Sequence, residues 1–259
     1  MIKTGMIGFG KMAQAIVEGW NNAKMRDVVE VYAYAPHQDK LKENCARMHA
    51  IPCASPQELC QAVDVIILAC KPAQVDGVIE QIAPHLHGKF VISVAAGITH
   101  ERLAEPLIGI PHVSVMPNTA MAALAGTLIV EEPNTMGDKE REMLQMMFAP
   151  LAAVVPVSEA LFGIAGTISG CGPAFLGLFA EALADAGVKY GLPRAIAAKL
   201  SAQTVYGAGA MLSRDGTEPS VFKNEICSPG GTTIRGIVTL EKDGFRRAVI
   251  EAIEAIQEK

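Results

Sequence analysis

The chain has 259 residues, a formal net charge of −5 and a hydrophobic share of 50%, with only 5% aromatic residues. The negative charge, without a basic stripe, excludes a nucleic-acid-binding surface from the expected functions. Purely apolar runs such as residues 65–70 are far shorter than the ~20 residues that span a bilayer, and glycines follow the first residue too closely for a secretory signal, so we expect a cytoplasmic protein without membrane contact.

The first half of the chain alternates apolar runs with amphipathic stretches. Runs rich in Val and Ile predict strands over residues 5–9, 28–34, 63–69, 90–95, 112–116, 127–131 and 153–157. Helical periodicity separates the first several of them, over residues 12–22, 37–48, 74–83 and 100–107. This alternation is typical of βαβ units that build a parallel sheet covered on both faces. We therefore predict an α/β fold that begins with a Rossmann-type, doubly wound sheet over residues 1–158.

The composition changes from residue 159 onward, and no convincing strand follows. Helical patterns predict helices over residues 173–191, 193–214, 220–226, 232–243 and 244–258. Small residues occupy several faces of the first two helices, as in helices that are buried almost all round. A region this short cannot bury so many helix faces alone. The sequence therefore predicts an all-α domain over residues 159–259 that joins two copies into a homodimer.

A glycine motif stands where the first predicted strand meets the first helix. Residues 8–13 fit the dinucleotide-binding pattern G-x-G-x-x-G/A, in which the glycines permit a tight turn and close approach to a pyrophosphate. The phosphates then lie at the positive end of the helix. An ordinary glycine turn is the alternative. The residues predicted to bind the cofactor here are Gly8, Phe9, Gly10, Lys11 and Met12.

Later strand ends complete the predicted cofactor site. The second strand ends without the acidic residue that would hold an NAD ribose, because Glu30 lies too early. NADPH is therefore the expected cofactor and NADH the alternative; His37 or Lys40 could reach a 2′-phosphate, or both could be solvated helix-start residues. Lys71 could donate to the nicotinamide or ribose, or simply cap a turn. The further predicted cofactor contacts are Ala35, His37, Ala69, Cys70, Lys71, Pro72, Ala95, Ala96 and Gly97.

A second glycine turn precedes a predicted helix at residues 228–233, with the sequence SPGGTT. Its bare amide hydrogens at a helix N-terminus form a receptor for a carboxylate, and the helix dipole adds roughly 0.3–1 kcal/mol. A threonine hydroxyl there can both donate and accept a hydrogen bond. Plain helix capping by Ser228 or Thr232 is the alternative.

These stretches resemble the pyrroline-5-carboxylate reductase family. SPGGTT is that family's signature, and further matches lie at residues 115–119 (VMPNT), 168–175 (ISGCGPAF), 181–187 (EALADAG), 191–194 (GLPR) and 240–245 (LEKDGF). The resemblance implies NADPH-dependent reduction of L-1-pyrroline-5-carboxylate to L-proline, the last step of proline biosynthesis. It also implies a site built between domains and across a dimer, which in turn could assemble into a larger ring.

The resemblance implies a role for each residue of this turn. The substrate carboxylate rests on it, and Thr233 is the catalytic candidate because it orients the ring nitrogen. Glu159 matches a family position near the substrate, or is a first-turn helix acid. The residues expected to bind the substrate are Ser228, Gly230, Gly231, Thr232, Thr233 and Glu159.

The sequence leaves the role of Glu225, the reactivity of two cysteines and the exact activity open. Glu225 stands where some family members have Asn, so it could repel the substrate or face solvent. The six cysteines show no metal-ligand spacing, which predicts reduced thiols and no metal site; alkylation of Cys171 or Cys227 could inhibit. The rivals are another imine reductase, a β-hydroxyacid dehydrogenase and a non-catalytic NADP-binding protein. The dehydrogenase requires Asn four residues after a helical lysine, but the residue four positions after Lys189 is Pro193.

Overall fold

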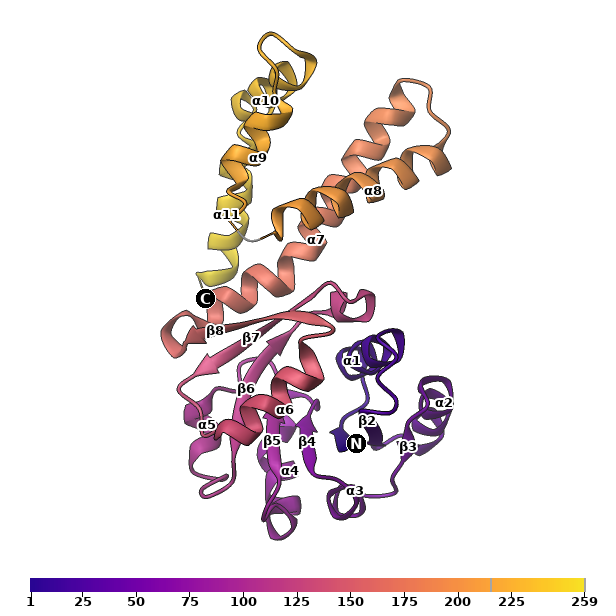
Figure 1. Ribbon diagram of the computed structural model, residues 1–259, viewed down its shortest axis with the longest axis vertical. Coiled ribbons are helices and arrows are strands. Elements are labelled where there is room, and N and C mark those ends of the chain that lie inside the picture. Colours follow the sequence, from indigo (N-terminus) through magenta and orange to yellow (C-terminus); the bar gives the residue numbers. More distant parts are fainter. Residues whose placement is uncertain (215, 259) are drawn as a thin grey trace. The chain divides into compact units, whose positions relative to one another are not determined.

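The structure is a computed structural model that describes residues 1–214 and 216–258. It divides into two compact units, Met1–Gly170 and Cys171–Lys259. One long helix, α7 (Glu159–Lys189), runs from the first unit into the second (Figure 1). Each unit is described by itself below.

The first unit is built on one sheet of eight strands in the order β3-β2-β1-β4-β5-β6-β7-β8. Because β1 lies between β2 and β4, the winding direction reverses between β1 and β4, and this is where doubly wound sheets bind their ligands. The strands are β1 (Ile2–Ile7), β2 (Val29–Tyr34), β3 (Ile51–Pro52), β4 (Val65–Leu68), β5 (Phe90–Ser93), β6 (His112–Pro117), β7 (Gly126–Glu132) and β8 (Ala152–Ser158).

Helices cover both faces of this sheet (Figure 1). One apolar core joins the sheet to α1, α2 and α6, with Ile16, Trp20 and Phe148 at its centre. The other core joins the opposite face to α3, α4 and α5 through Leu59, Ile79 and Leu103. The helices are α1 (Lys11–Asn22), α2 (Gln38–Met48), α3 (Pro56–Ala62), α4 (Val75–Ile82), α5 (His100–Ala104) and α6 (Asp138–Phe148).

The Rossmann-type sheet predicted from the sequence is confirmed, with corrections. The sheet is not wholly parallel, because β7 runs antiparallel to β6 before β8 pairs parallel to β7. The short strand β3 and the helices α3 and α6 were not predicted. Pro52 hid β3, since proline argues against a strand interior. The seven-residue helix α3 was missed although Ser55 caps it and Pro56 is at its first position, where proline is favoured.

The second unit contains the rest of α7 and the helices α8 (Arg194–Leu212), α9 (Pro219–Ile226), α10 (Thr232–Lys242) and α11 (Phe245–Gln257). A tight turn at Gly191 (φ +96°) leads from α7 to α8. The two helices pack closely, since a side chain at Gly187 would press on Leu192 and Ala197. The predicted helical region is confirmed, but the predicted start of its first helix is wrong. α7 begins at Glu159, so Pro173 lies inside the helix and not at its first turn.

α7 leaves much of its apolar surface exposed. Leu176 and Leu178 are 53% and 69% exposed, and on α8 Leu200 and Tyr206 are 54% and 65% exposed. Among the described helices, α7 is also the one long and apolar enough to cross a membrane, judged by length and composition alone. The search for unbroken apolar runs in the sequence missed α7, because its glycines divide the apolar residues into short runs.

Candidate active site

Gly8 forms the tight turn at the end of β1. Its backbone has φ +95°, and a Cβ there would stand 2.5 Å from the carbonyl oxygen of Ala69. The Gly8 N–H donates to Tyr34 O (2.8 Å), and Ala69 N–H donates to Ile7 O (2.8 Å), so the turn lies between the ends of β2 and β4. Both the conformation and the close approach require glycine at this position.

The N-terminus of α1 offers a receptor for an anion. Gly10 is its N-cap, no side chain caps the helix, and the first turn holds no acidic residue. A Cβ at Gly10 would meet nothing within 4 Å, so a ligand can approach the backbone there. Ala13 is 1% exposed and packs in the core, as the third position of the motif demands. A pyrophosphate therefore fits this turn.

A polar brace that was not predicted holds the same turn from behind. Gln14 Nε2 donates to Phe9 O (2.8 Å), and Arg47 of α2 donates to Gln14 Oε1 (2.7 Å). Phe9 itself is 5% exposed. The brace fixes the peptide between the two motif glycines. A polar residue between the apolar positions Ala13 and Ala15, in the first turn after the glycines, was the signal in the sequence.

The end of β2 carries no acidic residue that faces a ribose. Glu30 lies opposite Lys3 near the start of the strand and accepts a hydrogen bond from Tyr32 OH (3.1 Å). His37 and Lys40 are exposed at the start of α2, and the His37 side chain makes no cap bond. The absence of an acid at this tip is what a 2′-phosphate requires.

The remaining predicted cofactor residues follow β4 and β5, the next strands along the same edge of the sheet. Ala69 and Cys70 are half-buried, and burial raises the pKa of the Cys70 thiol. Lys71 is exposed, and its backbone N–H donates to Gln74 Oε1 (3.3 Å). After β5, Ala95 is buried and Gly97 turns with φ +72°. Pro72 and Ala96 are exposed.

The SPGGTT turn lies in the second unit at the start of α10. Gly230 has φ +69°, Gly231 N–H donates to Ser228 O (3.0 Å), and Gly231 is the N-cap. No side chain caps α10, so the capping alternative for Ser228 and Thr232 is wrong. Thr232 and Thr233 are exposed, and the first turn holds no acidic residue. The free amide hydrogens therefore suit a carboxylate.

Two acidic residues for which the sequence left two roles open are exposed. Glu159 is the first residue of α7, and Glu225 lies near the end of α9; both are exposed. All six cysteines are free, as predicted. Cys171 and Cys227 are half-buried, whereas burial raises the pKa of Cys45 and of Cys60 to about 11.

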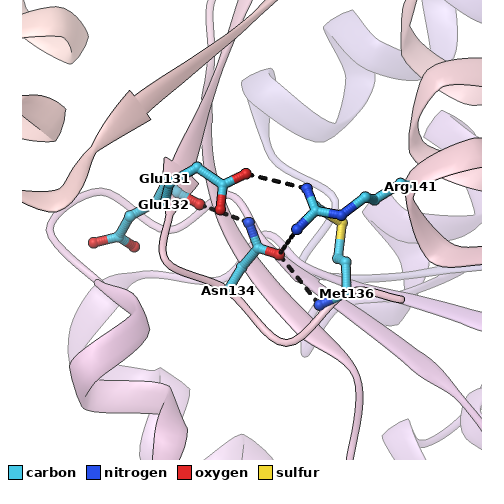
Figure 2. A network of polar contacts seen from close by, with 5 residues as sticks. All are labelled: Glu131, Glu132, Asn134, Met136 and Arg141. Carbon is cyan, nitrogen blue, oxygen red and sulfur yellow. Dashed lines mark hydrogen bonds and ion pairs between the residues drawn. The ribbon is translucent and has the colours of Figure 1, made fainter. Parts of the chain in front are cut away.

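A buried polar cluster around Glu131 of β7 lies on the α5 face of the sheet. Glu131 is fully buried and accepts a hydrogen bond from His100 N–H (2.7 Å), while the rings of His100 and His112 stack at 5.0 Å. Burial, and then the negative charge of Glu159, raise the pKa of Glu131, whereas burial lowers the pKa of His112. Beside the cluster, Asn134 links the end of β7 to α6 through Arg141 (Figure 2).

Comparison with known proteins settles the family. Residues 159–259 match the family described as pyrroline-5-carboxylate reductase dimerisation, and residues 3–97 match the family described as NADP oxidoreductase, coenzyme F420-dependent. A pyrroline-5-carboxylate reductase of Treponema pallidum (strain Nichols) is 41% identical over 259 residues, which cover 98% of each chain. The chain belongs to the pyrroline-5-carboxylate reductase family. The predicted resemblance is confirmed, and with it the assignment to the oxidoreductases.

Solved structures of the family agree over the same length. The Plasmodium falciparum pyrroline carboxylate reductase, determined with NADP bound, superposes with a TM-score of 0.83 at 32% identity, covering 98% of this chain and 95% of that one. A pyrroline-5-carboxylate reductase of Coxiella burnetii gives a TM-score of 0.86 at 29% identity with the same coverage. The predicted fold class is confirmed. The matched C-terminal family is one of dimerisation, which is consistent with a homo-oligomer that acts on a small molecule.

Proposed function

We propose that this protein reduces L-1-pyrroline-5-carboxylate to L-proline with NADPH, the last step of proline biosynthesis, and that NADH is the weaker alternative. The observation that carries the proposal is the pair of uncapped helix N-termini. One follows the Gly8–Gly10 turn and suits a pyrophosphate, and the other follows the SPGGTT turn and suits a carboxylate. A dinucleotide carries the pyrophosphate and an amino-acid-like imine carries the carboxylate, so the two helix N-termini match the two ligands of this reaction.

Each unit contributes its own part to the reaction. The amide hydrogens of Gly10 and the first turn of α1 hold the pyrophosphate, while Lys71, Ala96 and Gly97 line the nicotinamide end. NADPH supplies the hydride. The exposed first-turn amides of Thr232 and Thr233 hold the substrate carboxylate, while the Gly231 N–H closes the turn onto Ser228 O (3.0 Å). The Thr233 hydroxyl orients the ring nitrogen. A protonated imine is already electrophilic, so orientation and exclusion of water are the main contributions of the protein.

Two further parts of the proposal concern the whole protein. We propose residues 1–158 as the dinucleotide-binding domain and residues 159–259 as the helical substrate and dimerisation domain. A second copy, not a membrane, covers the exposed apolar faces of α7 and α8, because residues 159–259 match a family of dimerisation domains. Assembly of dimers into a larger ring, a cytoplasmic location and the absence of nucleic-acid partners complete the proposal.

Each alternative function differs from the proposed one in the residues that it requires of the protein. A β-hydroxyacid dehydrogenase needs a lysine in mid-helix, whereas Lys189 ends α7 and its ammonium lies over the Tyr190 ring (5.9 Å). A general imine reductase has no need of a carboxylate receptor at the SPGGTT turn. A non-catalytic NADP-binding protein has no need of that turn at all.

Steady-state oxidation of the reduced cofactor tests the proposal. We expect turnover with pyrroline-5-carboxylate and NADPH, slower turnover with NADH, and none with 3-hydroxy acids and NADP. A six-membered cyclic imine with a carboxylate measures the tolerance for ring size. Equal turnover of a cyclic imine that lacks the carboxylate would favour the general imine reductase, and no turnover of any imine would refute the proposal.

A further inference from the structure

The stretch of α7 around Pro173 is intrinsically a poor helix. Proline has no N–H, so the carbonyl four residues earlier, on Ser169, loses its helical partner, and the proline ring also presses on that carbonyl. Glycines at positions 163, 166, 170 and 172 weaken the helix further. The helix nevertheless continues without a break from Glu159 to Lys189. Something outside the helix must support it there.

The support comes from Asn118, which directly follows β6. Asn118 Nδ2 donates to Ser169 O (3.0 Å), the carbonyl that Pro173 leaves without a partner. Asn118 Oδ1 accepts a hydrogen bond from Thr127 N–H (3.2 Å), so the amide is held at both ends. The residue is only 7% exposed. The side-chain amide thus supplies the donor that the backbone of α7 lacks.

Met116, two residues before Asn118, makes a second contact between the end of β6 and α7. The end of the Met116 side chain lies directly against α7 at Gly166, so a side chain at position 166 would have to displace it. Asn118 continues the extended backbone of β6 (φ −122°, ψ 164°), so residues 116 and 118 point to the same side, and residues 166 and 169 lie on one face of α7. The strand and the helix therefore meet at two successive points. The Asn118 amide is aimed at Ser169 by this packing.

We propose that Asn118 is a positioning residue that keeps α7 continuous across Pro173, the segment that runs from the nucleotide-binding unit into the helical unit. Without its hydrogen bond, Pro173 becomes a hinge. The consequence for catalysis rests on the proposed function, in which the cofactor and substrate receptors belong to different units. A misplacement of about 1 Å between reacting groups can cost about 100-fold in rate.

The decisive test restores the missing donor in another way. In Pro173→Ala the new backbone N–H can bind Ser169 O directly, so Asn118 is no longer needed there. We expect Asn118→Leu to lower kcat for pyrroline-5-carboxylate about tenfold or more while the Kd for NADPH changes less than about twofold. Pro173→Ala alone should stay near wild type, and the double variant Asn118→Leu, Pro173→Ala should recover most of kcat.

Asn134 offers a matched control in the same unit. Its Nδ2 donates to Glu131 O (2.9 Å) and its Oδ1 accepts from Met136 N–H (3.2 Å), the same pair of bonds, but no proline is involved (Figure 2). Asn134→Leu should destabilise the fold without the selective loss of kcat. Pro173→Ala should not improve it. An equal fall of kcat in Asn134→Leu would overturn the proposal.

Hydrogen exchange of the α7 amides provides a readout that needs no substrate. Asn118→Leu should speed exchange at residues 174–177 about tenfold, Pro173→Ala should reverse the change, and Asn134→Leu should leave it near wild type. If the wild-type protein fails to reduce pyrroline-5-carboxylate, the proposed function fails, and exchange alone decides the role of Asn118. Unchanged exchange in Asn118→Leu, or no rescue by Pro173→Ala, would refute that role.

Discussion

At Gly8 and Gly10 the lack of a side chain serves two different purposes. Gly8 has φ +95° and faces the Ala69 carbonyl, so the fold itself demands glycine. Gly10 has φ −80° in extended backbone with open space around its Cβ position, so the fold tolerates alanine there. The requirement for glycine at position 10 therefore comes from the ligand.

This difference predicts that Gly10→Ala separates binding from stability. The free energy of unfolding should change by less than about 0.5 kcal/mol, since a surface substitution without strain has little effect. The Kd for NADPH, measured by fluorescence titration, should rise at least about tenfold because the methyl group occupies the pyrophosphate's approach. Gly88→Ala, in an exposed turn with φ +73°, serves as the control that alters stability without affecting NADPH. Unchanged NADPH affinity in Gly10→Ala would contradict the assigned site.

His112 should make stability depend on pH. Burial lowers its pKa below the ordinary value of 6.5, and the positive charge of His100 acts in the same direction. The unfolded chain therefore binds more protons than the folded chain, so stability falls as the pH drops below about 6.5. Urea unfolding at pH 7.5 and 5.5 should show a smaller loss in His112→Gln than in wild type. An identical loss in both proteins would show that His112 is not the titrating group.

Glu131 should contribute with the opposite sign. Burial raises its pKa above 4.5, so the folded chain holds the proton more tightly and stability falls as the pH rises above that value. Glu131→Gln keeps an oxygen to accept the His100 N–H and removes the charge. We expect the variant to gain stability relative to wild type between pH 5 and 8 in the same urea experiment. A Glu131→Gln variant that is less stable than wild type, by a margin that grows with pH, would contradict this assignment.

At the scale of whole elements, a negative charge at the start of α10 should stabilise the helix but weaken binding of the substrate carboxylate. Thr232→Glu places an acid in the first turn, where it should stabilise the helix by about 0.3–1 kcal/mol. The same charge should repel a carboxylate substrate, so KM for pyrroline-5-carboxylate should rise at least about tenfold. The neutral variant Thr232→Gln controls for size. A KM in Thr232→Glu equal to that of Thr232→Gln would show that the substrate carboxylate binds elsewhere.

The elements that the sequence predicted well are those with a local signal. The turn from β1 to α1 follows from its glycines, and the alternation of strands and helices follows from apolar periodicity. The start of α7 could not be predicted, because Gly170, Gly172 and Pro173 are typical of a helix boundary. The support that we propose for the helix there, the hydrogen bond from Asn118 to Ser169 O, comes from a residue 51 positions away in sequence. Gln14 and Arg47 were missed for the same reason, since their brace joins two helices.

At the scale of the whole molecule, the exposed faces of α7 and α8 predict association. Leu178→Glu places a charge on the most exposed of the α7 leucines and should weaken the dimer at least about tenfold, as expected when a buried apolar contact is lost. Sedimentation over a range of concentrations measures this change. Met146→Glu on α6, where the methionine is 54% exposed, is the control and should leave association unchanged. A monomeric wild-type protein would refute the proposed dimer.

Transfer of the nicotinamide hydrogen to the substrate tests the central claim most directly. The protein is given pyrroline-5-carboxylate and NADPH that carries deuterium at the transferable position, and the product is analysed by mass spectrometry and NMR. We predict L-proline with one deuterium at the former imine carbon, formed by wild type and much more slowly by Thr233→Ala. Proline without deuterium, or equal rates in both proteins, would contradict the account.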